Sequence, residues 1–153
     1  MDLLKPFKAK DHIKMDRDLL KLGDHIYRYG QGKMYTHHGI YIGGEMVIHY
    51  TRTEEGGKEA SSSETCPVCH YRSDLHRGVA KTCLDCFLAV QDQIYLYQYG
   101  VSASEASSFP VGSYSTKQSG PPLEAVDRAS QLLMHGFKRY NLLLNNCEDF
   151  AHF

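Results

Sequence analysis

The chain has 153 residues, of which 42% are hydrophobic and 23% charged, a composition typical of one globular domain and not of a disordered chain. Lysine and arginine number 17 against 18 aspartate and glutamate residues, so the charge balance gives no support to a nucleic-acid partner. The first 18 residues are charged, and no run of about 18 apolar residues occurs, so the sequence shows neither a signal peptide nor a membrane-spanning helix. We therefore expect a cytoplasmic chain in a reducing compartment, where paired cysteines are more often metal ligands than disulfides.

The hydrophobic pattern predicts an α+β fold, in which a small antiparallel sheet packs on helices. Residues 1–18 are predicted as an N-terminal arm or short helix, and residues 19–153 as one domain. The predicted strands are rich in apolar and aromatic residues, and they are 23–29, 36–43, 45–52, 91–99 and 112–117. The predicted helices are 101–108, 123–135 and a last one that begins near Cys147.

Four of the five cysteines form two Cys-x-x-Cys pairs, Cys66 with Cys69 and Cys83 with Cys86, separated by thirteen residues. Two such turns supply four thiolates to one ion, and four thiolates with no open position indicate a structural zinc. Residues from about 54 to 90 are therefore predicted as a zinc-containing insert, too poor in apolar residues to fold without the metal. Two disulfides or free thiols are the alternative. His70 and His76 are further candidate ligands, although a full set of cysteines makes them unnecessary.

The fifth cysteine, Cys147, stands alone at the predicted start of the last helix. Asn145 and Asn146 precede it as candidate caps, and two acids follow in the first turn, where the helix dipole favours them. The same dipole and the free backbone N–H groups stabilise a thiolate, and they can bind the oxyanion of an acyl intermediate. We therefore predict Cys147 as a catalytic nucleophile. The alternative is a small buried side chain, which is a common role for a free cysteine.

The strands 36–43 and 45–52 can pair in more than one register, and the hydrophobic pattern selects one. A three-residue loop over 43–45 pairs Ile40 with Ile48 and gathers the apolar side chains of both strands on one face. A two-residue loop would instead mix the isoleucines with Glu45. Because a shift of one residue moves every side chain to the other face, we predict the three-residue loop.

This register decides which histidines can act together, since a thiol nucleophile needs a base within hydrogen-bond reach. His37 and His49 share the face opposite the isoleucines, so we predict that these two act together as a base and the residue that orients it. His38 points the other way and is predicted as a rim or packing residue. The histidines predicted to lie at the surface are His12, His25, His135 and His152.

Two segments resemble the motifs of one enzyme family. They are Thr36-His37-His38-Gly39-Ile40-Tyr41-Ile42-Gly43, followed by His49, and Asn146-Cys147-Glu148-Asp149-Phe150. Together they resemble the lecithin retinol acyltransferase (LRAT) family, whose members include the H-box/NC proteins, a circularly permuted branch of the papain-like NlpC superfamily. The motif histidines fall on His37 and His49, and the motif cysteine on Cys147. The two Cys-x-x-Cys pairs and the tyrosine-rich strand after them are most similar to the plant LRAT-domain proteins.

The resemblance implies a thioester mechanism. Cys147 would attack an ester carbonyl of a phospholipid or another acyl lipid, and the acyl group would pass from the sulfur to water, an amine or an alcohol. His37 would activate the thiol and His49 would orient His37. A lipid substrate implies association with a membrane surface, and family members often continue into a C-terminal apolar anchor, whereas this chain ends at Phe153. A further departure is Asp149, which stands where many members have histidine.

Two other functions fit the same residues. The chain could be a thiol peptidase or amidase, which the superfamily chemistry allows, or a non-enzymatic module in which the zinc turns bind a partner protein. All three residues of the predicted nucleophilic site are present, which favours an enzyme over the module. Release or transfer of fatty acid from a phospholipid, lost in Cys147→Ala, separates the first function from the other two.

Overall fold

The fold is built on one antiparallel sheet with two α-helices in the described residues, which confirms the predicted α+β class. The computed structural model describes residues 12–30, 35–51, 64–72, 78–89, 91–110, 112–135 and 151. Several predictions fall outside these ranges, namely the first eleven residues of the predicted arm, His76, His152 and the nucleophile Cys147 with its two capping asparagines.

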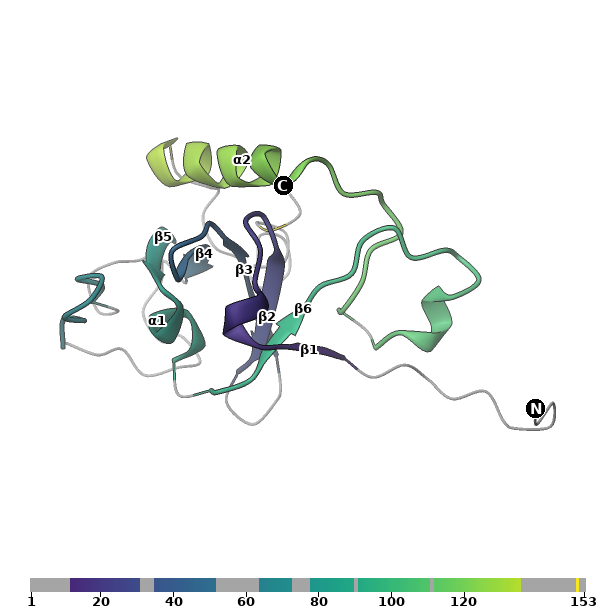
Figure 1. The fold of residues 1–153 in the computed structure, drawn as a ribbon, viewed down its shortest axis with the longest axis horizontal. Helices are drawn as coiled ribbons and strands as arrows, with labels where there is room; N and C mark the ends of the chain where they lie inside the picture. The colour runs from purple at the N-terminus through teal and green to yellow at the C-terminus, as the bar shows by residue number, and fades with distance from the viewer. Residues whose placement is uncertain are drawn as a thin grey trace.

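Six strands in the described part of the chain lie in the order β1-β6-β2-β3-β4-β5, and each is antiparallel to its neighbours. The strands are β1 Ile13–Met15, β2 His25–Tyr29, β3 Thr36–Tyr41, β4 Met46–Thr51, β5 Gly78–Cys83 and β6 Ile94–Leu96. The helices are α1 Leu84–Leu88 and α2 Pro122–His135, with 3-10 turns η1 Arg17–Leu19 and η3 Ala106–Ser108. In Figure 1, α2 lies across the sheet and α1 lies beside β5.

The register of β3 and β4 is the one that the hydrophobic pattern predicts. Ile40 pairs with Ile48, and the backbone N–H of Ile42 donates to the carbonyl of Met46 across the loop. Within the loop, Gly43 and Gly44 both take positive φ, a conformation that glycine adopts without steric cost. Ile40 and Ile48 therefore face one side of the sheet, and their neighbours in each strand face the other.

Each face of the sheet packs against one of the helices. On one face, Ile26, Tyr41 and Val47 form a buried cluster with Leu84 and Phe87 of α1. On the other face, a second cluster brings α2 onto β3 and β4, and its buried members are Ile40, Ile48, Tyr50, Ala129 and Ala151. We call these the α1 face and the α2 face.

The predicted insert at about 54–90 is only partly separate from the sheet. Its second half forms β5, which pairs with β4 over six residue pairs, and α1, whose Leu84, Phe87 and Leu88 are buried in the core. No strand was predicted in this half, and that is wrong. The strand was missed because Lys81 breaks its apolar pattern and Cys83 was assigned to a metal turn.

The described part of the predicted arm is also ordered. Residues Ile13–Met15 form an edge strand paired with β6, and Arg17–Leu19 form a 3-10 turn. The predicted helix 101–108 is a single 3-10 turn at Ala106–Ser108, and the predicted strand 112–117 contributes one isolated bridge, Gln98 with Tyr114. Three-residue elements carry little periodicity, so their pattern does not stand out from that of a loop.

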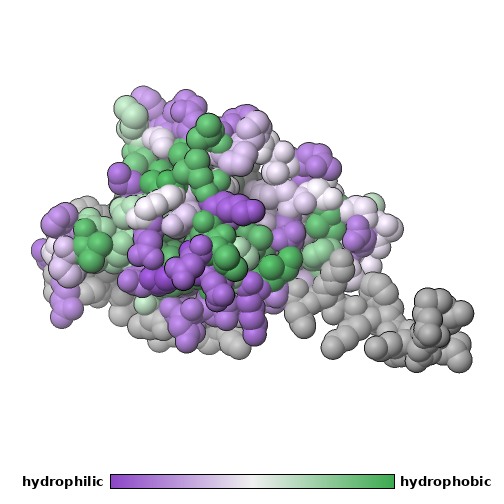
Figure 2. All heavy atoms as spheres, viewed as in Figure 1, coloured by the Kyte–Doolittle hydropathy of each residue, from purple (hydrophilic) through white to green (hydrophobic). Residues whose placement is uncertain are grey.

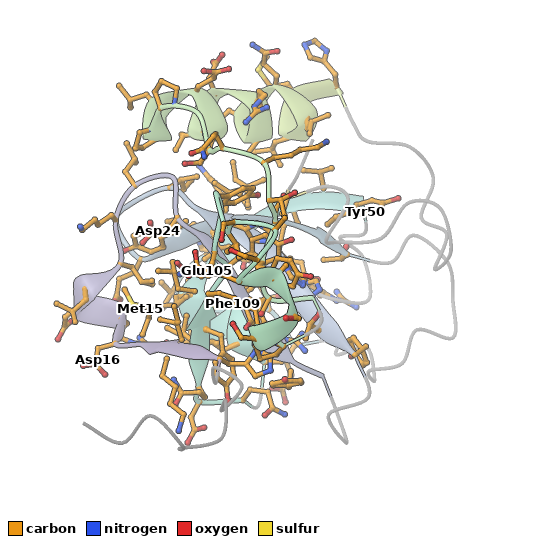
Figure 3. The ribbon with its side chains drawn as sticks, turned by 90° about the vertical axis from the view of Figure 1, so that its right-hand side faces the viewer. Met15, Asp16, Asp24, Tyr50, Glu105 and Phe109 are labelled. Atoms are coloured by element: carbon orange, nitrogen blue, oxygen red, sulfur yellow. The ribbon has the colours of Figure 1, made fainter. Side chains whose placement is uncertain are left out.

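The surface mixes apolar and polar residues. Figure 2 shows apolar patches interrupted by hydrophilic side chains, and the exposed large apolar residues are Ile13, Leu19, Leu22, Val68, Leu123 and Met134. Figure 3 shows Met15 of the edge strand β1 at the left and Tyr50 of β4 at the right, with Glu105 and Phe109 in the long connection between β6 and α2. No helix in the described ranges is both long enough and apolar enough to cross a bilayer.

Candidate active site and four-cysteine centre

His37 on β3 and His49 on β4 meet on the α1 face. Nε2 of His37 lies 2.9 Å from Nδ1 of His49, and the two rings are nearly perpendicular, with centroids 5.0 Å apart. This is the pairing that the predicted register requires, because Gly39 of β3 lies opposite His49. Nδ1 of His37 has no hydrogen-bond partner among the residues that the structure describes.

A third residue extends the pair. Nε2 of His49 lies 2.9 Å from the hydroxyl of Thr82 on β5, and that hydroxyl donates to the carbonyl of Cys83 at 2.9 Å. Both His49 and Thr82 are buried, so their polar atoms depend on one another and not on water. The result is a continuous series of hydrogen bonds from His37 through His49 to Thr82.

The surroundings keep both histidines neutral. Burial first, and then the positive charge of Arg28, lowers the pKa of His49 from 6.5 to about 3. The same two causes, with smaller contributions from the other histidines, hold the pKa of His37 well below 6.5. Arg28 pairs with His37 across β2 and β3, and its Nε donates to the carbonyl of Phe87 at 2.9 Å. A neutral imidazole is the form that can accept a proton from a thiol.

The ring of Phe87 on α1 packs against both histidines of the pair. Its ring centroid lies 5.3 Å from that of His37 and 5.2 Å from that of His49. Gly39 makes this approach feasible, because a Cβ at that position would lie 2.8 Å from the Phe87 ring and 2.7 Å from Val47. Glycine is therefore required in the His-His-Gly sequence by close packing and not by backbone conformation.

A second histidine pair lies on the α2 face, and it includes His25, which was predicted to be exposed. Nε2 of His25 lies 2.7 Å from Nδ1 of His38, and both side chains are buried. The outer nitrogens of this pair also have partners, the hydroxyl of Tyr99 at 2.8 Å and that of Thr36 at 2.9 Å. The surface prediction is thus wrong for His25, whereas the packing role predicted for His38 is confirmed.

His12 was also predicted as a surface histidine without a partner, and this is wrong. Its two ring nitrogens hydrogen-bond the hydroxyls of Tyr27 and Tyr29. His135, by contrast, is exposed as predicted. The pattern of the sequence did not show the difference, because the hydroxyls of Tyr27 and Tyr29 on β2 come near His12 only when β1 and β2 join the same sheet, one on each side of β6.

The four paired cysteines converge at the end of β5. Their sulfur atoms all lie within 4.8 Å of one another, with Cys66 3.8 Å from Cys83 and Cys69 3.6 Å from Cys86. Four sulfurs each about 2.3 Å from one tetrahedral ion lie about 3.8 Å apart, so this spacing fits a metal site. All four are free cysteines, and His70 is not part of the cluster.

The first cysteine turn has the backbone of a metal-binding knuckle. The N–H of His70 donates to the carbonyl of Cys66, and His70 takes a φ of 63°, which closes the turn. Hydrogen bonds from the backbone at Cys69 and Val68 lower the pKa of the Cys66 thiol to about 6, whereas burial raises the pKa of Cys83. Inward N–H groups favour the thiolate form, which is the form that binds a metal ion.

Three residues of the histidine site were missed in the sequence. Thr82 lies 33 residues from His49, and Phe87 and Arg28 come from α1 and β2. The alternation of the β5 residues offered a signal for Thr82, since small and polar residues alternate there with Val79, Lys81 and Cys83. No local pattern points to Arg28 as a neighbour of His37.

The sequence profile of the family described as lecithin retinol acyltransferase matches residues 18–153. The chain belongs to this family, as the motifs around His37, His49 and Cys147 predict, and membership suggests an acyltransferase-type function. Among individual proteins, the chain is similar to Protein LEAD-SENSITIVE 1 of Arabidopsis thaliana, a plant LRAT-domain protein. The two are 37% identical over 155 residues, which cover 90% of this chain and 58% of the relative, so the chain spans little more than half of that protein's length.

Proposed function

We propose that the protein is a thiol acyltransferase or phospholipase A-type enzyme that forms an acyl thioester on Cys147. The observation that carries the proposal is the histidine pair. One nitrogen of His37 is held by His49, and the other has no hydrogen-bond partner among the described residues. A neutral histidine with one nitrogen oriented and the other open is the arrangement that a general base needs. Family membership supports the acyltransferase chemistry.

In the proposed reaction, Nδ1 of His37 takes the thiol proton of Cys147, and the thiolate attacks the ester carbonyl carbon of a phospholipid. The tetrahedral intermediate collapses, the carbon–oxygen bond to glycerol breaks, and the departing lysophospholipid alkoxide takes the proton from His37. Water, an amine or an alcohol then attacks the thioester and gives its proton to His37. That proton returns to the sulfur as the acyl product leaves.

The proposed fold relationship is the permuted papain-like arrangement, with a cysteine at the start of the last helix and a histidine on a neighbouring strand. Ala151, four residues after Cys147, packs in the core cluster of the α2 face, whereas His37 and His49 lie on the α1 face. Contact between the Cys147 thiol and His37 is therefore the part of the proposal that an experiment has to test.

Two measurements test it. A fluorescent phospholipid assay should show fatty-acid release, or transfer to an amine, by the wild type and neither by Cys147→Ala. The rate at which iodoacetamide alkylates Cys147 should show a lowered thiol pKa in the wild type, and an ordinary pKa in His37→Ala. Equal lipid turnover by the wild type and Cys147→Ala would refute the lipid activity, and equal alkylation profiles would refute the pairing.

We further propose that the four-cysteine centre holds a structural zinc ion. Cys66, Cys69, Cys83 and Cys86 offer four sulfurs at tetrahedral spacing, and such a closed set stabilises a fold without supplying a catalytic position. Metal analysis of the purified protein should give about one zinc per chain, and Cys69→Ser should lower both the zinc content and the melting temperature. A folded wild-type protein without any bound metal would refute the structural role.

The proposed substrate is a phospholipid or another acyl lipid at a membrane surface, which the protein would reach as a peripheral protein. Exposed apolar side chains such as Leu19 and Leu123 are suited to such contact. Co-sedimentation with phosphatidylcholine vesicles should retain the wild type and lose Leu19→Asp, with Ser104→Asp as a control at an exposed site.

A further inference from the structure

We propose that Thr82 is a positioning residue for the histidine pair, and that through His49 it decides which nitrogen of His37 carries the proton. The inference rests on the proposed function, because it concerns the base of that reaction. Its evidence is a hydrogen-bond pattern among His37, His49 and Thr82, which can be measured whether or not Cys147 is a nucleophile.

The carbonyl of Cys83, at the end of this series of hydrogen bonds, decides which atom donates in each of them. The carbonyl oxygen of Cys83 can only accept, so the single hydroxyl proton of Thr82 lies in the 2.9 Å bond to that oxygen. The Thr82 oxygen must then accept from Nε2 of His49, which lies 2.9 Å away. The opposite assignment would place two acceptors against each other in a buried site, where an unmade hydrogen bond costs most.

The same logic continues to His37. A neutral imidazole with its proton on Nε2 has a lone pair on Nδ1, so Nδ1 of His49 accepts the proton of His37 Nε2 at 2.9 Å. His37 is also neutral, and its lone pair is therefore on Nδ1. This is the nitrogen without a partner among the described residues, and the one that the proposed reaction uses.

The sheet places Thr82 where it can do this. Thr82 pairs with Val47, and Ala80 pairs with His49, so Thr82 lies diagonally across from His49 on the same face. The small side chain of Ala80 leaves room for the ring of His49 to lean toward Thr82, at a spacing that diagonal neighbours can bridge. The side chain of Thr82 is fully buried, so no water replaces its hydroxyl.

Thr82→Val keeps the shape of the side chain and removes the hydroxyl. The proton on Nε2 of His49 then has no acceptor. It can regain a partner by moving to Nδ1 and donating to His37, which forces the proton of His37 onto Nδ1. A His37 in that form cannot accept the thiol proton. Loss of the Thr82 hydroxyl therefore lowers the reaction rate through the tautomers of His49 and His37.

The test is a long-range proton–nitrogen NMR spectrum of the full-length, uniformly nitrogen-15-labelled protein at about neutral pH, with His37 and His49 assigned through His→Asn variants. In the wild type and in Thr82→Ser, both rings should show the proton on Nε2. In Thr82→Val, both should shift toward the form with the proton on Nδ1. A wild-type spectrum with the proton of His49 on Nδ1, or a Thr82→Val spectrum unchanged from the wild type, would overturn the proposal.

The second readout is lipid turnover. Thr82→Val should lower kcat about 10- to 100-fold, by analogy with the cost of losing the outer hydrogen-bond partner that fixes the tautomer of a functional histidine, and Thr82→Ser should restore most of it. Ser108→Ala is the matched control, because it removes a buried hydroxyl that donates to a nearby backbone carbonyl at 2.6 Å, away from both histidines. It should keep wild-type kcat.

The two proposals fail in different ways. If Cys147→Ala retains full lipid turnover, the proposed reaction is wrong, and the NMR spectra alone decide the role of Thr82. If Cys147→Ala is inactive but Thr82→Val turns over lipid at the wild-type rate, the reaction stands and the positioning role is refuted. A drop in Thr82→Val that Thr82→Ser does not rescue also refutes it, because it would reflect a loss of packing.

Discussion

Two hydrogen-bonded histidine pairs among the residues that the structure describes lie on opposite faces of the same sheet, and they include adjacent residues, His37 and His38. The pair on the α2 face, His25 with His38, ends on Tyr99 at one side and on Thr36 at the other, so all four ring nitrogens have partners. The pair on the α1 face ends on Thr82 at one side, and at the other side Nδ1 of His37 meets no hydrogen-bond partner within the described ranges. Both pairs are thus held by hydrogen bonds at the ring nitrogens, and the difference in hydrogen bonding is one nitrogen, Nδ1 of His37.

That difference separates a structural network from a candidate base. A buried network in which every polar group is satisfied adds rigidity and leaves nothing to react. A network that ends on an unpartnered lone pair holds a ring in place and keeps one atom available. His37 is also partly exposed, whereas His38 is completely buried. We therefore expect substitutions in the two pairs to fail in opposite ways, one in activity and the other in stability.

The largest expected effect is on activity in His37→Ala. Removing the proposed base should lower the proposed lipid turnover by about a thousandfold or more, because general-base catalysis together with activation of the nucleophile is lost. The melting temperature should fall less than in His38→Ala, since the ring of His37 is partly exposed and its removal takes a hydrogen-bond partner from one buried group, Nδ1 of His49. Turnover and thermal unfolding of the same preparation check this. Retained turnover would mean that the open nitrogen is not the base.

His38→Ala is expected to show the reverse. It removes a completely buried ring and leaves Nε2 of His25 and the hydroxyl of Thr36 without their partner. The free energy of unfolding should fall by about 2–5 kcal/mol, from the cavity and the orphaned polar groups. Most of the turnover should remain at a temperature where the variant is folded. Urea unfolding gives the first quantity, and a loss of activity in fully folded protein would contradict the comparison.

A smaller effect is expected from Gly39→Ala, which disturbs the packing of Phe87 against His37 and His49 without removing a functional group. The new Cβ would lie 2.7 Å from Val47 and 2.8 Å from Phe87, so the ring that supports both histidines has to move. Overpacking of this kind costs about 1–3 kcal/mol of stability. Gly120→Ala is the control for adding a methyl group, since its Cβ would meet only the end of the Glu124 side chain, at 3.2 Å, and Gly120 does not take a positive φ.

The last prediction concerns the free energy of unfolding, which should change gradually with pH. His49 has a pKa of about 3 in the folded chain and 6.5 in the unfolded chain, so between these values the unfolded state binds more protons. Stability should therefore fall as the pH drops from about 6.5 toward 3, by up to about 1.4 kcal/mol per pH unit for this group. The difference between wild type and His49→Gln, in urea unfolding at several pH values, isolates the contribution. Parallel pH profiles for the two proteins would contradict it.

The predictions that held came from patterns carried by neighbouring residues. Alternation and the glycine loop placed β3 and β4 in register, which put His37 and His49 on one face. The turn and helix signals around Pro122 and His135 located α2. The two Cys-x-x-Cys spacings predicted a four-sulfur cluster, and the four sulfur atoms do converge. Each of these features is decided within a hairpin, a helix or a tight turn, so the sequence is enough.

The features that failed depend on strands that meet only in the folded sheet. His25 was predicted at the surface because its partners, His38 and Tyr99, come from β3 and from the segment after β6. β5 was taken for part of a polar insert, although it supplies six residue pairs to the sheet. Charge and polarity alone suggested exposure in both cases, and only cross-strand partners make such residues compatible with burial.

The sequence by itself determined that this protein has a hairpin with two histidines on one face, and it predicted which residues match the family motifs. Those conclusions rest on a period of two residues and on short spacings, which the chain carries locally. Only the tertiary structure decided that His49 ends on Thr82, 33 residues away, and that Arg28 and Phe87 surround the pair. The physical reason is that hydrogen-bond direction and desolvation belong to groups brought together by folding, and no single segment contains them.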